Sequence, residues 1–303
     1  MTGPFCAQSD CCSTQAELRG DPPEGSAAPG ARWLLVEHQG PWSVHAFRRS
    51  PTLALLARRA TALGGRAALI RRPGQRVPRP GQPPRPRRWA LVDARPGYER
   101  VWWSTFTDEA ELLDVPLDPP QVPPSTEPVY LVCTQGRHDA CCAIRGRPVA
   151  AALAARYPDR TWECSHIGGC RFSANVVLLP HGLVYAHATP QSAPGLVEAY
   201  AEGRVRPDTL RGRTSLAGPV QAAQHQAREK TGELSVDAFR PLGSEQVGEQ
   251  AWRVRLAYRG GELTVLVRGE WAEPELLTCR ATVPARSRRF AAEVAEVAEV
   301  VQA

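Results

Sequence analysis

The sequence has little lysine, and it lacks long apolar runs, a visible secretory signal and a strong net charge. Lys230 is its only lysine, and the other 36 of its 37 basic residues are arginines. No apolar run approaches about 18 residues, so we expect no transmembrane helix. The first 20 residues have neither a basic start nor an apolar stretch, so we expect no secretory signal and a cytoplasmic protein. The net charge of +6 is dilute over 303 residues and does not by itself indicate a nucleic-acid partner.

Several catalytic motifs are absent as well. The chain contains no C-x-x-C motif, which argues against thioredoxin-type dithiol chemistry. It has no glycine-rich phosphate loop and no G-x-S-x-G elbow. Nine cysteines, by contrast, is a high count for a reducing compartment. Their odd number and their clustering favour metal ligation over a disulfide framework.

The order of predicted elements repeats along the chain. Residues 1–30 are rich in Gly, Pro, Ser and Ala and are expected to be irregular. Residues 31–118 predict strand, helix, strand, strand, strand and helix, and residues 125–205 predict the same order. A β-α-β unit followed by a hairpin and a helix is typical of thioredoxin-like domains. We therefore expect an α/β fold of tandem thioredoxin-like domains, each a mixed sheet with flanking helices, followed by a small C-terminal α+β region at 206–303.

The C-terminal region is expected to combine helices and strands. Residues 215–230 predict a helix, and alternating apolar residues predict strands at 252–258 and 263–267. A third strand is expected at 276–283. Valines spaced three residues apart predict an amphipathic helix over 287–300.

Cysteines and histidines concentrate in the second repeat. Five cysteines and two histidines fall within 38 residues: Cys133, His138, Cys141, Cys142, Cys164, His166 and Cys170. Cys133 ends a predicted strand, and Cys141 and Cys142 lie in a polar loop before a helix expected from about Pro148. The second segment is a C-x-H-x3-C cluster whose Gly168 and Gly169 let the backbone bend, so that its ligands converge. Such loops can hold a zinc ion or an iron–sulfur cluster, although buried core cysteines are the alternative interpretation.

Four further cysteines and one loop lie outside this cluster. Cys6, Cys11 and Cys12 form either a second metal site or part of a disordered or packed start of the chain. Cys279 is expected to be a core residue of the 276–283 strand. Residues 71–88 contain seven arginines and six prolines, which predict an exposed polyproline-prone loop. That loop is either simply solvated or docks an acidic redox partner through its charge.

Three segments of the second repeat, 133–148, 162–172 and 175–182, resemble the sucrase/ferredoxin-like family. Residues 32–37 and 40–42 extend the resemblance, which covers most of the chain. Members of this family are thioredoxin-like [2Fe–2S] proteins.

The resemblance also implies a set of cluster ligands: Cys133, Cys142, His166 and Cys170. Better studied relatives bind the cluster through two Cys and the two His of an H-x-G-G-H motif. The Cys170 of this sequence departs from that motif and resembles the C-x3-C pair of thioredoxin-like bacterial ferredoxins. Two alternatives stay open: Cys141 could replace Cys142, and Cys164 could replace His166.

The resemblance predicts a single-electron carrier with a [2Fe–2S] cluster and a redox partner protein, either a reductase or an electron acceptor. One cluster is expected, because the first repeat has Glu37 and His38 at the positions of Cys133 and Thr134. The helix expected from about Pro148 should point its positive N-terminal end at the anionic cluster and stabilise it. Nearby arginines are expected to add positive charge: Arg137, Arg145, Arg147 and Arg171. Alternative functions are a cluster-dependent reductase of a ferric chelate or a disulfide, and a zinc-stabilised binding protein.

Overall fold

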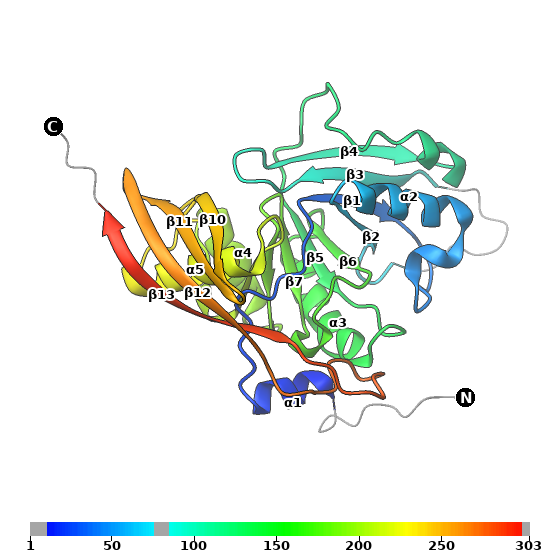
Figure 1. The fold of residues 1–303 in the computed structure, drawn as a ribbon. Helices are drawn as coiled ribbons and strands as arrows, with labels where there is room; N and C mark the ends of the chain where they lie inside the picture. Colours follow the sequence, from blue (N-terminus) through cyan, green and yellow to red (C-terminus); the bar gives the residue numbers. More distant parts are fainter. Residues whose placement is uncertain (1–10, 76–84, 299–303) are drawn as a thin grey trace.

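Two sheets with helices packed on them make up the computed structural model, which describes residues 11–75 and 85–298 (Figure 1). The larger, mixed sheet contains nine strands, β1 (Arg32–Glu37), β2 (Arg66–Arg71), β3 (Arg87–Asp93), β4 (Arg100–Phe106), β5 (Val129–Cys133), β6 (Thr161–Cys164), β7 (Val176–Leu179), β8 (Leu183–Tyr185) and β9 (Leu210–Arg213). Their order across the sheet is β4-β3-β1-β2-β6-β5-β7-β8-β9.

The first half of this sheet comes from the first predicted repeat. Strand β1 pairs parallel with β2 and antiparallel with β3, which pairs with β4. A 3-10 turn, η2 (Ala46–Arg49), and helix α2 (Pro51–Ala62) connect β1 to β2, and η3 (Glu109–Asp114) follows β4. Helix α2 begins as predicted, because the Ser50 hydroxyl accepts a hydrogen bond from the Leu53 amide at 3.1 Å.

The second half repeats that topology. Strand β5 pairs parallel with β6 and antiparallel with β7, which pairs with β8. The connecting elements are α3 (Ala140–Arg156), η4 (Cys170–Phe172), α4 (Ala193–Ala201) and η5 (Pro207–Thr209). The order β8-β7-β5-β6 matches β4-β3-β1-β2, so the predicted repeat of mixed sheets with flanking helices is confirmed. Antiparallel pairing of β2 with β6 joins the halves, and β9 extends the sheet although it lies in the region 206–303.

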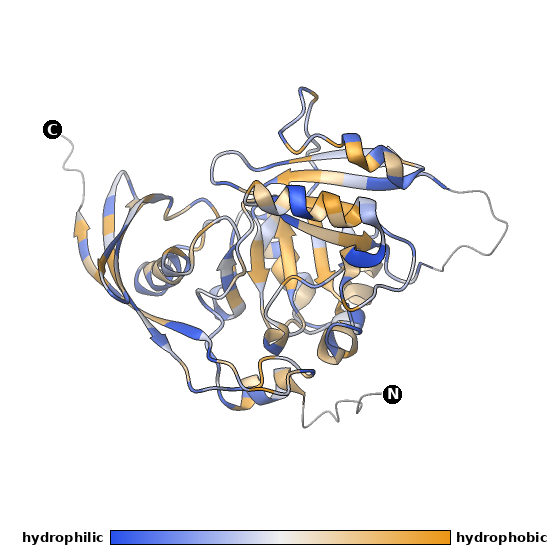
Figure 2. Ribbon diagram, turned by 45° about the vertical axis from the view of Figure 1, so that its right-hand side comes forward, coloured by the Kyte–Doolittle hydropathy of each residue, from blue (hydrophilic) through white to orange (hydrophobic). Residues whose placement is uncertain are grey.

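The two halves share one apolar cluster, in which residues from strands far apart in the sheet order meet. Trp103 of β4 stacks on Trp162 of β6 with ring centroids 5.5 Å apart. Leu35 and Leu131, from the central strands of the two halves, lie in the same buried cluster. Figure 2 shows the apolar strands at the centre of the molecule, between the helices that cover them. The cysteines of the second repeat therefore lie at the edge of a dry interior.

The smaller sheet is antiparallel and wraps around one helix. It contains β10 (Pro241–Gly248), β11 (Ala251–Tyr258), β12 (Gly261–Trp271) and β13 (Arg288–Ala298) in sequential order. Helix α5 (Gly218–Thr231) lies in its concave face (Figure 1). Ala223 and Ala227 of this helix pack in one core with Val254 and Val265 of the sheet. The expected α+β composition of this region is confirmed.

Two predictions for the C-terminal region are wrong. Residues 287–300 were expected to form a helix, but Arg288–Ala298 form β13. The pairing of β12 with β13 contains a bulge, so Val265 faces Val294 whereas Leu263 faces Val297. One extra residue in the bulged strand turns the strand spacing of two into a spacing of three, which imitates a helix. The predicted strand 276–283 is likewise absent, and the segment 272–287, which we call the arm, is irregular with an isolated bridge between Glu275 and Ala285.

The N-terminal segment also differs from its prediction. Helix α1 (Cys12–Leu18) lies in the range that was expected to be irregular. Its residues Cys12, Ser13 and Ala16 are buried, and the arm reaches α1 from the far end of the chain (Figure 1). Cys6 and the middle of the Arg/Pro loop, residues 76–84, lie outside the described residues. Among the helices that the structure does describe, none has the length and apolar character needed to cross a membrane.

Candidate metal centre

The candidate site lies where the parallel strands β5 and β6 end. Cys133 is the last residue of β5 and Cys164 the last of β6, and the two are partners in register. Parallel strands bring their carboxyl ends to the same edge, so the loops that follow them, 134–139 and 165–169, face each other. The amide nitrogen of His166 donates a hydrogen bond to Gln135 Oε1 at 2.6 Å and ties the two loops together.

Helix α3 starts earlier than predicted. It begins at Ala140 rather than near Pro148, because the carboxylate of Asp139 accepts a hydrogen bond from the Cys141 amide at 3.1 Å and caps the helix. Pro148 lies inside the helix. Cys141 and Cys142 therefore occupy the first helical turn, not a loop. The positive end of the helix still points at the site, as expected.

A glycine lets this helix approach the strand. A Cβ on Gly146 would lie 2.2 Å from the carbonyl oxygen of Cys133, a distance that no side chain tolerates. The residue is therefore required to be glycine by close packing and not by its backbone angles. This contact holds the first turn of α3 against the end of β5.

Adjacent residues of that first turn face different surroundings. Neighbouring positions on an α-helix point about 100° apart. The Cys142 thiol faces Cys133 and Cys170, and its interaction with these two thiols raises its pKa. The Cys141 sulfur lies 3.6 Å from Cys12 Sγ and 3.0 Å from Cys279 Sγ, in a separate group.

The loop after β6 brings the next two predicted residues together. Gly168 and Gly169 have φ angles of +90° and +74°, which glycine adopts without strain. The bend places Cys170 Sγ 3.4 Å from His166 Nδ1, as the sequence predicted. Behind the loop, the buried guanidinium of Arg211 donates hydrogen bonds to the Gly168 carbonyl at 3.0 Å and to Asn175 Oδ1 at 2.8 Å.

Thiolates are favoured at two of the four predicted positions. Hydrogen bonds from Cys142 and Cys164 hold the pKa of Cys133 well below its usual range. A hydrogen bond from Cys142, with others from His138 and His166, lowers the pKa of Cys170 to about 4. Donation of its proton to these neighbours raises the pKa of Cys142. These two positions therefore favour the thiolate, which is the form that ligates a metal.

His138 is a member of this group that the implied ligand set leaves out. Its ring stacks on that of His166 with centroids 3.7 Å apart. A hydrogen bond to Cys170 raises the pKa of His138. His138, His166 and Cys170 each offer a donor atom within 4.8 Å of the others. The five cysteines and two histidines singled out in the sequence therefore gather at one end of α3, although Cys141 faces a different group.

The nearby arginines contribute less charge to the site than expected. Arg145 is engaged by Glu17 of α1 at 2.7 Å, and Arg171 lies 3.4 Å from Asp21. Arg137 and Arg147 are exposed. Arg211, which sequence reasoning missed, is the buried cation behind the site, and burial lowers its pKa to about 9. Nothing in its local sequence marks it, since it is one arginine of 36.

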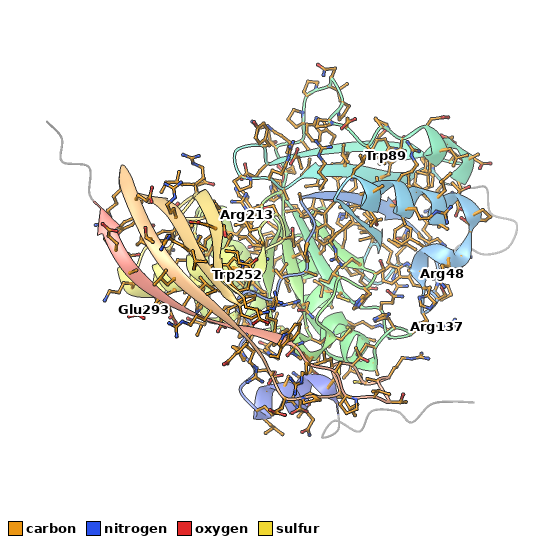
Figure 3. All side chains as sticks on the ribbon, in the orientation of Figure 1. Arg48, Trp89, Arg137, Arg213, Trp252 and Glu293 are labelled. Atoms are coloured by element: carbon orange, nitrogen blue, oxygen red, sulfur yellow. The ribbon has the colours of Figure 1, made fainter. Side chains whose placement is uncertain are left out.

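An open pocket adjoins the site on the side of the histidines. It has a volume of about 410 Å³, and its lining includes His138 and His166 from the site and Arg48 and Arg58 from the first half of the sheet. Gln135 Nε2 donates a hydrogen bond to the Ser43 carbonyl at 2.6 Å, which holds the two walls together. Figure 3 shows Arg48 and Arg137 at the same end of the molecule. The exposed side of the site is therefore cationic.

The comparison with family models agrees with the resemblance read from the sequence. No curated protein matches the chain. One similar solved structure is a variant of the thioredoxin-like [2Fe–2S] ferredoxin from Aquifex aeolicus, with 20% identity, 28% of this chain and 97% of that chain covered, and a TM-score of 0.25. The sucrase/ferredoxin-like family model matches residues 23–212, which is more than half of the sequence and includes both halves of the large sheet. The chain therefore belongs to the sucrase/ferredoxin-like family.

Proposed function

We propose that this protein carries single electrons on a [2Fe–2S] cluster held by Cys133, Cys142, His166 and Cys170. The observation that carries the proposal is the convergence of these four side chains at the ends of β5 and β6. Three of them are thiols with at most 2% of their surface exposed, and the fourth, His166, is half-buried.

The donor set fits such a cluster. Each iron of a [2Fe–2S] centre takes two protein ligands, and thiolate and imidazole are its known ligands. Cys170 Sγ lies 3.4 Å from His166 Nδ1, and Cys142 interacts with both Cys133 and Cys170. When bound, the cluster would supply the one-electron chemistry. The chain would hold it, exclude water on the strand side and leave the histidine side open.

The geometry favours Cys142 over Cys141 as a ligand. Cys142 faces Cys133 and Cys170, whereas Cys141 faces Cys12 and Cys279. The second alternative, Cys164 in place of His166, is less favoured, because Cys164 is fully buried beside Cys133, whereas His166 lines the pocket.

The two adjacent cysteines offer a matched test. Protein purified without oxygen should be coloured and contain about two iron and two sulfide per chain. Cys142→Ser should lose most of the colour, and the control Cys141→Ser should keep it. A colourless, iron-free wild type would reject the proposal in favour of a zinc-stabilised binding protein. Loss of colour only in Cys141→Ser would overturn the ligand assignment.

The pocket favours a second candidate, a reductase that uses the cluster on a small substrate. Arg48 and Arg58 of the pocket would attract an anion such as a ferric chelate. The same cationic end would serve as a docking surface for an acidic redox partner in the first candidate. The reduced protein should be mixed anaerobically with ferric citrate and, separately, with an acidic ferredoxin reductase. The reductase would be favoured if ferric citrate reoxidises the protein fast and if Arg48→Glu slows this reoxidation at least tenfold. The cluster content of the variant should be unchanged.

A further inference from the structure

A second group of metal-ligating side chains lies outside the proposed cluster. It joins Cys12 of α1, Cys141 and Asp139 at the start of α3, and Cys279 of the arm, whose donor atoms all lie within 4.8 Å of one another. Cys12, Asp139 and Cys141 are buried, and Cys279 is half-buried. We propose that these four residues bind one zinc ion, which fastens helix α1 and the arm to the start of helix α3.

The distances fit a single tetrahedral ion. Zinc bonds of about 2.3 Å to sulfur and about 2.1 Å to oxygen place tetrahedral sulfurs about 3.8 Å apart, and sulfur and oxygen about 3.6 Å apart. Cys12 Sγ lies 3.6 Å from Cys141 Sγ, 3.6 Å from Cys279 Sγ and 3.6 Å from Asp139 Oδ2. The remaining sulfur pair, Cys141 and Cys279, is closer at 3.0 Å, so these two sulfurs must move apart when the ion binds. That separation is still far longer than the roughly 2.05 Å of a disulfide.

The surroundings orient the donor atoms as zinc sites require. Asp139 Oδ1 accepts the Cys141 amide at 3.1 Å, and Oδ2 accepts the Cys279 amide at 3.0 Å, so the carboxylate is fixed from both sides. The Cys12 amide donates to Cys279 Sγ at 3.4 Å. Hydrogen bonds of this kind hold ligands in place around protein-bound metals.

An ion can reach the site. A pocket of about 250 Å³ is lined by Cys12, Arg19, Glu275 and Cys279, and it opens between α1 and the arm. Three thiols and one carboxylate with zinc's ligand types and spacing favour zinc over calcium or magnesium, which prefer oxygen ligands. The thiols would release their protons to solvent as the ion binds.

The segments that the ion would join are distant in the sequence. Cys12 and Cys279 are 267 positions apart, and Asp139 lies between them. The hydrogen bond from Arg280 to the Arg137 carbonyl at 2.9 Å also holds the arm beside the start of α3. A structural ion would therefore close long loops and fix the arm on the start of α3, next to Cys142.

Metal analysis of the full chain tests the proposal independently of the cluster. Wild type should contain about one zinc in addition to its iron. Cys12→Ser and Cys279→Ser should each lose that zinc to a mild chelator while the visible spectrum persists, whereas Cys142→Ser should keep it and lose the spectrum. Cys11→Ala is the matched control, because Cys11 is a buried neighbour outside the donor set and its substitution should leave zinc in place.

Two further measurements test the proposal even if the cysteine variants fail to fold. Asp139→Asn keeps the helix cap but removes the anionic ligand, and it should weaken zinc binding at least tenfold. Cobalt added to the chelated wild type should produce the intense absorption of a tetrahedral thiolate site, and Cys279→Ser should not. The proposal fails if chelated wild type gives no such absorption, if zinc survives in both cysteine variants, or if mass analysis shows a Cys141–Cys279 disulfide in fresh protein.

Discussion

His166 is the residue with the most specific chemical role in this account. As the proposed ligand, it would replace a thiolate by a neutral imidazole, so the cluster would carry one negative charge fewer than with four cysteines. Replacement of Cys by His raises the reduction potential in Rieske centres. We therefore expect His166→Cys to keep the cluster and to lower its potential, measured by anaerobic spectroelectrochemistry. An unchanged potential would mean that His166 is not a ligand, and His138→Ala would then be the next variant to test.

The residue scale also shows what local sequence could and could not predict. The His166–Cys170 contact followed from spacing and two glycines, and the structure confirms it. The division between Cys141 and Cys142 did not follow, because it depends on where α3 starts. Cys279 was predicted to be a core residue of a strand. Its contacts with Cys12 and Cys141 could not be predicted, because these partners lie more than a hundred residues away in the sequence. No short window of sequence contains that information.

At the scale of elements, the packing of α3 on β5 controls the site. Gly146→Ala would place a Cβ 2.2 Å from the Cys133 carbonyl and push the helix away from the strand. We expect a loss of about 1–3 kcal/mol of stability and a reduced cluster content. Gly195→Ala in α4 is the matched control, because its nearest neighbour would be a flexible arginine atom at 3.9 Å. Chemical denaturation and iron analysis measure both effects, and equal behaviour of the two variants would contradict this packing argument.

Strand and helix identities were predictable wherever apolar spacing was regular. Strand β1, helix α2 and strand β11 follow their patterns closely. The apolar spacing wrongly predicted a helix at β13, because a bulge shifted the spacing of Val294 and Val297. It also misled at α1, a short helix whose buried face is formed by Cys12, Ser13 and Ala16 rather than by large apolar residues.

At the scale of the whole molecule, the buried His38 and the half-buried His181 and His187 make stability depend on pH. Burial lowers the pKa of His38, His181 and His187 below the usual 6.5. The unfolded chain therefore binds more protons below pH 6.5, so these groups contribute stability at neutral pH that is lost as the pH falls. His38→Gln should make the melting temperature less sensitive to pH between about pH 7.5 and pH 5. An unchanged slope would show that His38 does not titrate with unfolding.

The repeat explains why only one half of the large sheet bears the candidate centre. Strand β1 of the first half ends at Glu37, in the place where β5 ends at Cys133. The first half instead contributes Arg48 and Arg58 to the pocket beside the histidines. The sequence predicted this asymmetry from cysteine placement, but not that the halves would form one continuous sheet through β2 and β6.

The central claim is a [2Fe–2S] cluster with three cysteines and His166 as ligands. Pulsed EPR of the dithionite-reduced, full-length protein tests it most directly, because a coordinated imidazole couples its nitrogen to the unpaired electron. We expect the EPR signal of a reduced [2Fe–2S] cluster with strong nitrogen coupling, and we expect His166→Cys to keep the signal but lose the coupling. A wild-type signal without nitrogen coupling, or coupling that survives in His166→Cys, would contradict this claim.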